Sequence, residues 1–271
     1  MSNVDDIEIP LLLDAIYSRY HYDFRSYSMA SLKRRLAVAR MQLGCDTLSN
    51  LQAKVLHEPE AFARLLQYLT VQVSDMFRDP SFFRAMREHV VPVLRTYPSL
   101  KVWVAGCSTG EELYSYAILL HEEGLLERTI LYATDINPES LHKAAAGVYP
   151  IDRIAAFTES HLLSGGKGTL ANYYSAAYGR AAFDRALRKN VVFSDHSLAT
   201  DSVFAEVQVV SCRNVMIYFD RALQERALQL LKDALCRRGF LGLGAKESLQ
   251  FTEQANAFQQ LMPGEVWYQR C

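Results

Sequence analysis

The sequence predicts an α/β protein in which an all-α helical domain over residues 1–97 precedes a doubly wound, Rossmann-like domain over residues 98–271, with a small insertion at 147–189. Apolar residues recur at helical spacing through the first part. From residue 100 onward, short β-rich runs alternate with helical segments, the order typical of a largely parallel sheet covered by helices. With 271 residues, half of them apolar, the chain is long enough for a real hydrophobic core.

The N-terminal domain is predicted to contain five helices, at residues 12–20, 32–43, 47–57, 59–73 and 80–94. Several boundaries carry residues that begin or end helices. Gly44 suits a C-cap after the second helix, and Pro59 and Pro80 suit the first turns of the later ones. A helical block of this size ahead of the first strand indicates a separate unit.

One of these helices is strongly basic. Between residues 25 and 40 there is no acidic residue, and the basic ones are Arg25, Lys33, Arg34, Arg35 and Arg40. A solvated helix face is the simpler interpretation, and a docking surface for an acidic partner is the functional one. Nucleic acid is disfavoured because aromatic residues are not interleaved with these charges and the net charge is −1.

The second domain is predicted to alternate strands and helices. The strands lie at 101–105, 129–134, 190–194, 207–211 and 239–244, and the helices at 111–122, 138–146 and 220–236. The insertion at 147–189 breaks this pattern. It contains Gly165, Gly166 and Gly168 followed by several tyrosines, which indicates a loop and a small hairpin.

Composition narrows the class of protein. The five cysteines include no C-x-x-C pair, so reduced thiols are expected in place of disulfides or a zinc site. No metal site is predicted, because His121-Glu122-Glu123 lacks the second histidine of H-E-x-x-H. No apolar run approaches the ~20 residues of a membrane helix, and no signal peptide is recognised at the acidic N-terminus. A cytoplasmic protein without membrane insertion is expected.

The second domain is organised around residues 101–112. A β-rich run ends at Ala105, glycines follow at 106 and 110, and a helix-forming run begins at Glu111. This arrangement brings backbone N–H groups and the positive end of a helix up to a ligand. A dinucleotide would need G-x-G-x-x-G, which is absent. A serine hydrolase, S-adenosylmethionine and a tight connection without a ligand remain as interpretations.

Two polar residues follow other predicted strands. Asp135 comes after strand 129–134, and Asn214 follows strand 207–211. Ligands of open α/β sheets bind outside the carboxyl ends of the strands, and a carboxylate there can accept hydrogen bonds from ribose hydroxyls. Capping of the next helix is the simpler role for Asp135. We expect the glycine turn, Asp135 and Asn214 to converge on one pocket.

The hydrolase interpretation depends on the sequence Gly106-Cys107-Ser108-Thr109-Gly110, which matches G-x-S-x-G. Ser108, Asp135 and either His161 or His196 stand in the order of a catalytic triad. However, a nucleophile elbow normally follows several strands, whereas this turn follows the first. The sequence also contains no His-Gly-Gly-Gly oxyanion segment. A serine hydrolase using Ser108 is therefore the less favoured alternative.

Four motifs occur in order between residues 69 and 220: LTVQVSDMFRD at 69–79, VWVAGCSTGEELYS at 102–115, ATDI at 133–136 and CRNVMIYFD at 212–220. Their residues and their order resemble those of the CheR family of chemotaxis methyltransferases. The resemblance implies a Rossmann-like S-adenosylmethionine methyltransferase domain behind a helical domain that docks the substrate. It also implies methylation of glutamate side chains on the cytoplasmic helices of chemoreceptors, giving methyl esters.

Carried over by position, the resemblance implies the residues that hold S-adenosylmethionine. They are Gln72, Ser74, Arg78, Glu111, Asp135, Ser197, Leu198, Asn214 and Val215. Arg78 suits the methionine carboxylate because a guanidinium can donate two parallel hydrogen bonds to it. Arg78 and Tyr218 are the residues expected to orient the incoming glutamate. The basic helix, with Lys33, Arg34, Arg35 and Arg40, would face the acidic receptor.

The chain departs from the family pattern at several positions. Gln72 and Ser74 stand where the family has Asn and Thr, and Ser197 stands where it has Asn. The family's His-Ser-Glu near the C-terminus is matched here to Lys246-Glu247-Ser248. The insertion, which in the family can hold a small sheet used for docking on receptors, is short. These departures leave open a second interpretation, a regulatory module that binds S-adenosylmethionine or a receptor without turnover.

Overall fold

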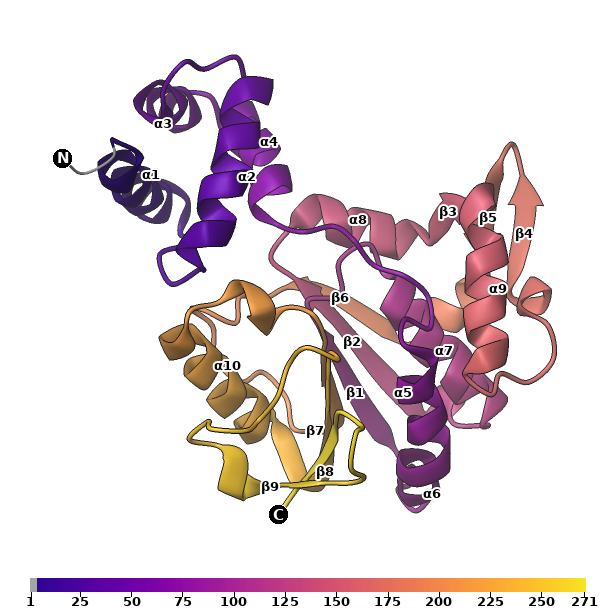
Figure 1. Ribbon diagram of the computed structural model, residues 1–271. Coiled ribbons are helices and arrows are strands. Elements are labelled where there is room, and N and C mark those ends of the chain that lie inside the picture. Colours follow the sequence, from indigo (N-terminus) through magenta and orange to yellow (C-terminus); the bar gives the residue numbers. More distant parts are fainter. Residues whose placement is uncertain (1–3) are drawn as a thin grey trace. The chain divides into compact units, whose positions relative to one another are not determined.

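The computed structural model describes residues 4–271, which form two compact units (Figure 1). The helical unit contains the chain up to Gln72 together with Leu198–Asp201 and Tyr218–Ala227. The α/β unit contains Val73–Ser197, Ser202–Ile217 and Leu228–Cys271. Two short segments from late in the sequence therefore belong to the first unit.

The helical unit is built from four helices: α1 Asp5–Tyr20, α2 Met29–Gln42, α3 Leu48–His57 and α4 Pro59–Leu69. Apolar residues on their facing sides are buried, including Leu12, Leu36 and Leu65. Each such side chain contributes roughly 1.5–3 kcal/mol by leaving water. The predicted helices are confirmed, although α4 ends at Leu69, because the backbone at Thr70 is extended.

The structure corrects the predicted basic surface of helix α2 at one residue. Arg35 does not belong to an exposed basic surface, because only 8% of it is exposed. Its Nη1 donates a hydrogen bond to the Leu69 carbonyl, and its guanidinium lies 4.4 Å from the centre of the Tyr218 ring. Burial lowers the pKa of Arg35. Residues three or four apart in a helix share a face, so Arg35 lies on the same buried face as Leu32 and Ala39. Counting charges does not take this helical period into account.

The α/β unit has a seven-stranded sheet in the order β6-β2-β1-β7-β8-β10-β9. The strands are β1 Leu100–Ala105, β2 Thr129–Asp135, β6 Val191–Asp195, β7 Val207–Cys212, β8 Leu235–Leu243, β9 Phe258–Gln260 and β10 Trp267–Arg270. The first five strands in this order are parallel, and β10 is antiparallel to both of its neighbours. The predicted α/β fold and its five parallel strands are confirmed, while β9 and β10 were not predicted.

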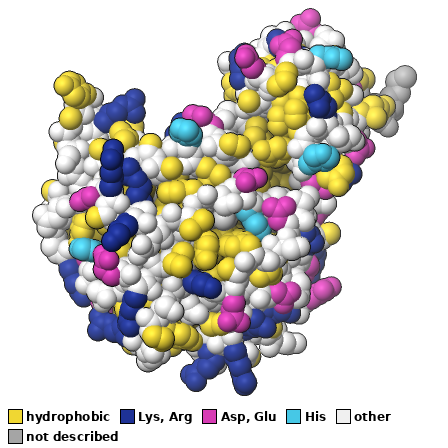
Figure 2. Space-filling model, turned by 180° about the vertical axis from the view of Figure 1, so that it is seen from behind, with side chains coloured by type: hydrophobic (Ala, Val, Ile, Leu, Met, Phe, Trp, Pro, Cys, Tyr) yellow, Lys and Arg dark blue, Asp and Glu magenta, His cyan; other side chains and the backbone are white. Residues whose placement is uncertain are grey.

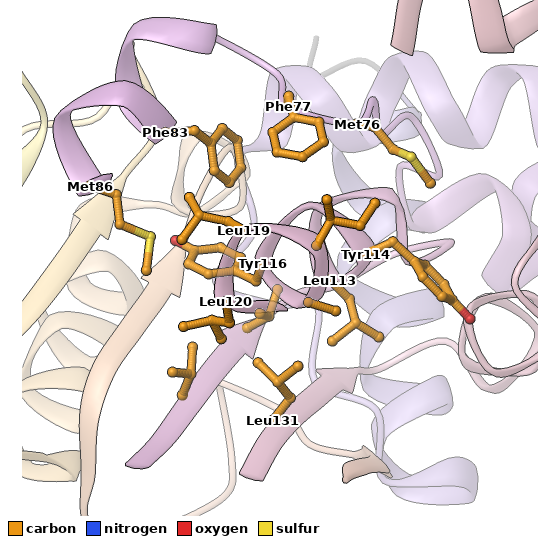
Figure 3. Packing of buried hydrophobic residues seen from close by; sticks show 14 of the residues in the cluster. Met76, Phe77, Phe83, Met86, Leu113, Tyr114, Tyr116, Leu119, Leu120 and Leu131 are labelled. Carbon is orange, nitrogen blue, oxygen red and sulfur yellow. The ribbon is translucent and has the colours of Figure 1, made fainter. Parts of the chain in front are cut away.

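Helices cover this sheet. They are α5 Pro80–Ala85, a π-helical turn Met86–Val90, α6 Val91–Leu94, α7 Glu111–Glu122, α8 Pro138–Ala146 and, from Leu228 onward, the second half of α10 Arg221–Ala234, whose first half belongs to the helical unit. Helix α7 is apolar on most of its circumference and lies in the centre of the core. In Figure 3, its residues Tyr116, Leu119 and Leu120 lie between Phe83 and Met86 on one side and Leu131 of β2 on the other. This packing fixes the start of α7 at the carboxyl end of β1.

The insertion is larger than the predicted hairpin. Strands β3 Val148–Pro150, β4 Tyr174–Ala177 and β5 Arg180–Phe183 form an antiparallel sheet in the order β3-β5-β4, and helix α9 Ile154–Leu163 lies between β3 and β4 in the chain. The β4–β5 hairpin is confirmed. Helix α9 escaped prediction because Leu162 and Leu163 are exposed, so its apolar residues have no helical period.

The insertion is attached to the sheet domain by buried charges. His161 of α9 lies 2.7 Å from Glu122 of α7, and Arg87 pairs with both Glu122 and Glu123. The outer surface of the insertion is basic: in Figure 2, Lys and Arg side chains gather over the insertion beside hydrophobic ones at the hairpin.

Within residues 4–271, no helix combines the length and the apolar character needed to cross a bilayer.

Candidate functional site

The turn after β1 is shaped by two glycines in the left-handed backbone region, Gly106 at φ +68° and Gly110 at φ +94°. A Cβ added to Gly106 would lie 2.5 Å from Cγ2 of Val215, and one added to Gly110 would lie 2.8 Å from Cα of Ala144. Such distances are far shorter than a van der Waals contact. Only glycine therefore fits here, and the turn lies directly against the segment that follows β7.

Asp135 ends β2 beside this turn. Its Oδ2 accepts a hydrogen bond from the Ser108 backbone N–H at 2.8 Å, and its Oδ1 accepts one from the Asn137 N–H at 2.9 Å. Burial raises the pKa of Asp135, although these donors oppose the shift. A carboxylate offers about four lone-pair sites, so Asp135 retains the capacity to accept a further hydrogen bond, as a ribose hydroxyl would donate.

The hydrolase alternative is wrong for this geometry. Ser108 adopts φ +51°, as a nucleophile elbow would, but its buried Oγ has no hydrogen-bond partner among residues 4–271. His161 instead contacts Glu122, and the Nε2 of His196 lies 3.1 Å from the Ser202 carbonyl oxygen. Asp135 binds the backbone of Ser108 and not a histidine. A serine without a base cannot be activated as a nucleophile.

Glu111 begins α7 and is 1% exposed. Its Oε2 accepts a hydrogen bond from Thr109 Oγ1 at 2.6 Å, and its Oε1 accepts one from Arg153 Nη1 at 2.5 Å. A carboxylate at a helix N-terminus is also favoured by the helix dipole. Glu111 thus presents a fixed negative charge at the glycine turn. Arg153 belongs to the insertion, and no motif pointed to it.

The segment that carries Ser74 and Arg78 is held in place by Arg213. Phe77 and Asp79 adopt φ +50° and +56°, strained values for these residues. Buried Arg213 donates to the Arg78 carbonyl at 2.8 Å and to Asp79 Oδ2 at 2.7 Å. Its Nη1 also donates to Glu112 Oε2 at 3.0 Å. This explains the arginine of the CRN motif: it fixes the backbone of Arg78.

The turn after β7 surrounds a buried carboxylate. Glu247 Oε2 accepts hydrogen bonds from the N–H groups of Asn214 and Gly244, both at 2.8 Å. Its Oε1 accepts those of Val215 at 3.0 Å and Met216 at 2.8 Å. Burial raises the pKa of Glu247. In the sequence, Glu247 stands out only as part of a departure from the family pattern, whereas in the structure it holds the Asn214–Val215 turn in place.

Most of the predicted site residues belong to the same compact unit. Ser74, Arg78, Glu111, Asp135, Ser197, Asn214 and Val215 all belong to the α/β unit. Of these, Ser197 follows His196, whose N–H donates to the Asp135 carbonyl at 3.3 Å. Gln72, Leu198 and Tyr218 belong to the helical unit. Their part in the site stays a prediction.

The chemistry of this edge suits an amino-acid-bearing nucleoside. Glu111 can accept from an ammonium group and Asp135 from ribose hydroxyls. The guanidinium of Arg78, half-buried, forms no ion pair within residues 4–271 and can donate to a carboxylate. Among these described residues, no group of three or more His, Cys, Asp or Glu side chains could hold a metal ion.

Two family descriptions match the chain: "CheR methyltransferase, all-alpha domain" matches residues 7–70, and "CheR methyltransferase, SAM binding domain" matches residues 72–264. "Putative methyltransferase Cher3" of Pseudomonas putida is 60% identical over 257 residues, which cover 95% of this chain and 94% of that protein. "Chemotaxis protein methyltransferase 2" of Pseudomonas aeruginosa is 31% identical over 225 residues (80% and 76%). "Chemotaxis protein methyltransferase" of Salmonella typhimurium is 28% identical over 257 residues (90% and 85%).

The parallel sheet, the glycine turn and the matched domain define a Rossmann-like methyltransferase that binds S-adenosylmethionine. Both family descriptions together cover nearly the whole sequence. The chain belongs to the CheR methyltransferase family. The resemblance seen in the four motifs is thereby confirmed.

Proposed function

We propose that this protein transfers the methyl group of S-adenosylmethionine to glutamate side chains of chemoreceptor-like proteins, forming glutamyl methyl esters. The observation that carries the proposal is the placement of Glu111 and Asp135 at the glycine turn, Glu111 buried and Asp135 half-buried, each with lone pairs available. The names of the relatives, chemotaxis protein methyltransferases, support the choice of substrate. The reaction would take place in the cytoplasm, where receptor signalling helices lie.

The cofactor would be held at its two polar ends. Arg78 would bind the methionine carboxylate, Glu111 the ammonium group and Asp135 the ribose hydroxyls. Val215 would pack beside the glycine turn, against which its side chain already lies. The remaining predicted contacts, proposed on the family pattern alone, are Gln72, Ser74, Ser197, Leu198 and Asn214.

The transfer needs little acid–base chemistry. The cofactor supplies a methyl group bonded to a positively charged sulfur. A glutamate carboxylate is ionised near neutral pH, so its oxygen attacks the methyl carbon without losing a proton first. The new C–O bond forms as the C–S bond breaks, and the electron pair of that bond stays on sulfur. The protein would contribute by positioning the two reactants and by excluding water.

Arg78 and Tyr218 would orient the incoming carboxylate. The backbone of Arg78 is fixed by Arg213, so its guanidinium projects from a rigid segment. The Tyr218 ring lies 4.4 Å from the Arg35 guanidinium within the helical unit, which limits its rotation. On helix α2, Arg34 and Arg40 are left for an acidic receptor helix, because Arg35 is buried and Lys33 pairs with Asp6 of α1. Lys33 would have to exchange Asp6 for a receptor carboxylate to take part.

Transfer of a tritiated methyl group onto receptor fragments tests the proposal. A base-labile label on glutamate is expected with the wild-type protein. Arg78→Ala should retain its fold, checked by thermal unfolding, and lose transfer by about two orders of magnitude if it positions both reactants. The control is Arg84→Ala, which removes an exposed arginine of the same segment whose bond goes to the Leu163 carbonyl.

The alternative, a regulatory module, predicts a different result. It would bind S-adenosylhomocysteine in calorimetry while no receptor fragment acquired the label. Label that resists base treatment would point to an acceptor other than a carboxylate. Either result would refute glutamate methylation.

A further inference from the structure

Arg153 joins three parts of the α/β unit. It ends the short 3-10 turn Ile151–Arg153 of the insertion. Its Nη1 donates to Glu111 Oε1 at 2.5 Å, and its Nη2 donates to Asp75 Oδ1 at 2.7 Å and to the Ser74 carbonyl. Its guanidinium also lies 4.7 Å from the centre of the Phe157 ring. One side chain thus connects the insertion, the start of α7 and the segment that precedes Arg78.

The charges in this cluster leave a place for a cation. Glu111 and Asp75 carry one negative charge each, and Arg153 carries one positive charge, so the sum is one negative charge. Glu111 accepts hydrogen bonds from Thr109 and Arg153, whereas a carboxylate offers about four lone-pair sites. An ammonium group could therefore bind Glu111 while Arg153 keeps its position.

The alternative is that Arg153 occupies the ammonium position and must leave when a ligand binds. Leaving would break the bonds to Glu111, Asp75 and Ser74 and would separate Arg153 from Phe157. It would also leave Glu111, which is 1% exposed, without its guanidinium. Unpaired buried charges are costly, so a retained Arg153 is favoured.

We propose that Arg153 is a positioning residue of the cofactor site, which fixes the Glu111 carboxylate and the Ser74–Asp75 backbone so that they receive the amino-acid end of the cofactor. The proposal deepens the proposed function and rests on it, because it assumes that Glu111 receives the ammonium group. It also gives the insertion a role in cofactor binding. The insertion can fill that role because buried His161 and Glu122 attach α9 to α7.

The inference predicts that Arg153 matters for one end of the cofactor only. Calorimetry would compare S-adenosylhomocysteine with 5′-methylthioadenosine, which has the same nucleoside and sulfur but no amino-acid end. Arg153→Ala should weaken S-adenosylhomocysteine by about tenfold or more, the usual loss when a charge-assisted bond is removed. It should change methylthioadenosine binding by less than about twofold. Arg153→Lys keeps the positive charge but not the two parallel N–H donors of the guanidinium, so its affinity for S-adenosylhomocysteine should lie between those of the wild type and Arg153→Ala.

Two controls separate this role from a general loss of structure. Arg185→Ala removes another arginine of the insertion, one that is exposed, and should bind both ligands like the wild type. A double-mutant cycle with Glu111→Gln supplies a second measurement. If Arg153 acts through Glu111, its removal should cost far less in the Glu111→Gln background.

Several results would overturn the inference. The first is that Arg153→Ala binds S-adenosylhomocysteine as tightly as the wild type or more tightly. Tighter binding would indicate that Arg153 occupies the ammonium position and must leave when the ligand binds. Equal weakening of both ligands, or additive effects in the cycle, would reduce Arg153 to a structural residue. If the wild-type protein itself bound no S-adenosylhomocysteine, the proposed function would fail first, and this result is distinct from all the others.

Discussion

Two buried glutamates lie at the carboxyl edge of the sheet, and their surroundings differ. Glu247, beneath the turn after β7, accepts four backbone N–H bonds, two on each oxygen. Glu111, at the turn after β1, accepts bonds from two side chains, one on each oxygen. A carboxylate offers about four lone-pair sites. Glu247 is therefore saturated and maintains the shape of a turn, whereas Glu111 remains able to bind a ligand.

The largest expected effect comes from removing the saturated carboxylate. Glu247→Ala would leave four buried N–H groups without an acceptor, and each such group costs about 1–3 kcal/mol. Water entering the cavity would recover part of this cost, so a loss of about 3–5 kcal/mol in the free energy of unfolding is expected. Urea unfolding measures it. A loss below about 1 kcal/mol would show that the turn does not depend on Glu247.

Glu111→Gln should give the opposite pattern. The amide keeps an oxygen for Thr109 or Arg153, so the free energy of unfolding should change by at most ~1 kcal/mol. Binding of S-adenosylhomocysteine should weaken by about tenfold to a hundredfold, because the charge that would pair with its ammonium is lost. Calorimetry measures the binding constant. Glu139→Gln, an exposed glutamate of α8, is the matched control.

Should Glu111→Gln instead lower stability as strongly as Glu247→Ala, the contrast between a binding and a structural carboxylate would fail. The two variants are thus informative as a pair, since each acts mainly on the property that the other leaves unchanged.

Asp135 allows the same contrast to be tested by pH. Burial raises its pKa above the usual 3.8. A raised pKa in the folded state means that protonation of Asp135 stabilises the fold at low pH, and this contribution is lost as the pH rises through the folded pKa. Ligand binding should respond in the reverse direction, because a protonated carboxyl accepts ribose hydrogen bonds poorly. Affinity for S-adenosylhomocysteine should therefore fall as the pH drops from 7 toward 4.

The fall in affinity should approach about tenfold at the lowest pH, the cost of one lost charge-assisted bond. Asp135→Asn should bind weakly but with a flatter pH profile. An equally steep profile in Asp135→Asn would assign the titration to another group.

The sequence predicted these sites unevenly, and the reason is physical. Strand ends and glycine turns are local features, so Asp135, Glu111 and the turn between Gly106 and Gly110 could be found from periodicity and motif spacing. Glu247 binds a turn more than thirty residues away, and its contacts are all to backbone groups, which carry no residue-type signal. Arg153 lies in an insertion with little apolar period.

Arg35 shows the same limit in the helical unit. In the sequence it is one of several neighbouring basic residues, yet its position on the α2 helix buries it. Arg35 stabilises the helical unit, because its Nη1 donates a hydrogen bond to the Leu69 carbonyl and its guanidinium contacts the Tyr218 ring. Arg34, in contrast, is exposed. Arg35 and Arg34 therefore differ in the same way as Glu247 and Glu111: the first of each pair stabilises the structure, and the second remains able to bind a partner.

This pair gives the prediction with the smallest effect. Arg34→Glu reverses an exposed charge, so it should slow methyl transfer onto an acidic receptor fragment by about twofold to fivefold at low salt, since one surface charge contributes below ~1 kcal/mol. The difference should shrink near 0.5 M salt, where the Debye length falls to about 4–5 Å. Binding of S-adenosylhomocysteine should stay at the wild-type value. Initial rates of tritium transfer measured at two salt concentrations provide the test. Equal rates for Arg34→Glu and wild type at low salt would show that α2 is not part of the receptor-binding surface. A loss of rate that persists at high salt would show that Arg34, like Arg35, is needed for the structure of the helical unit.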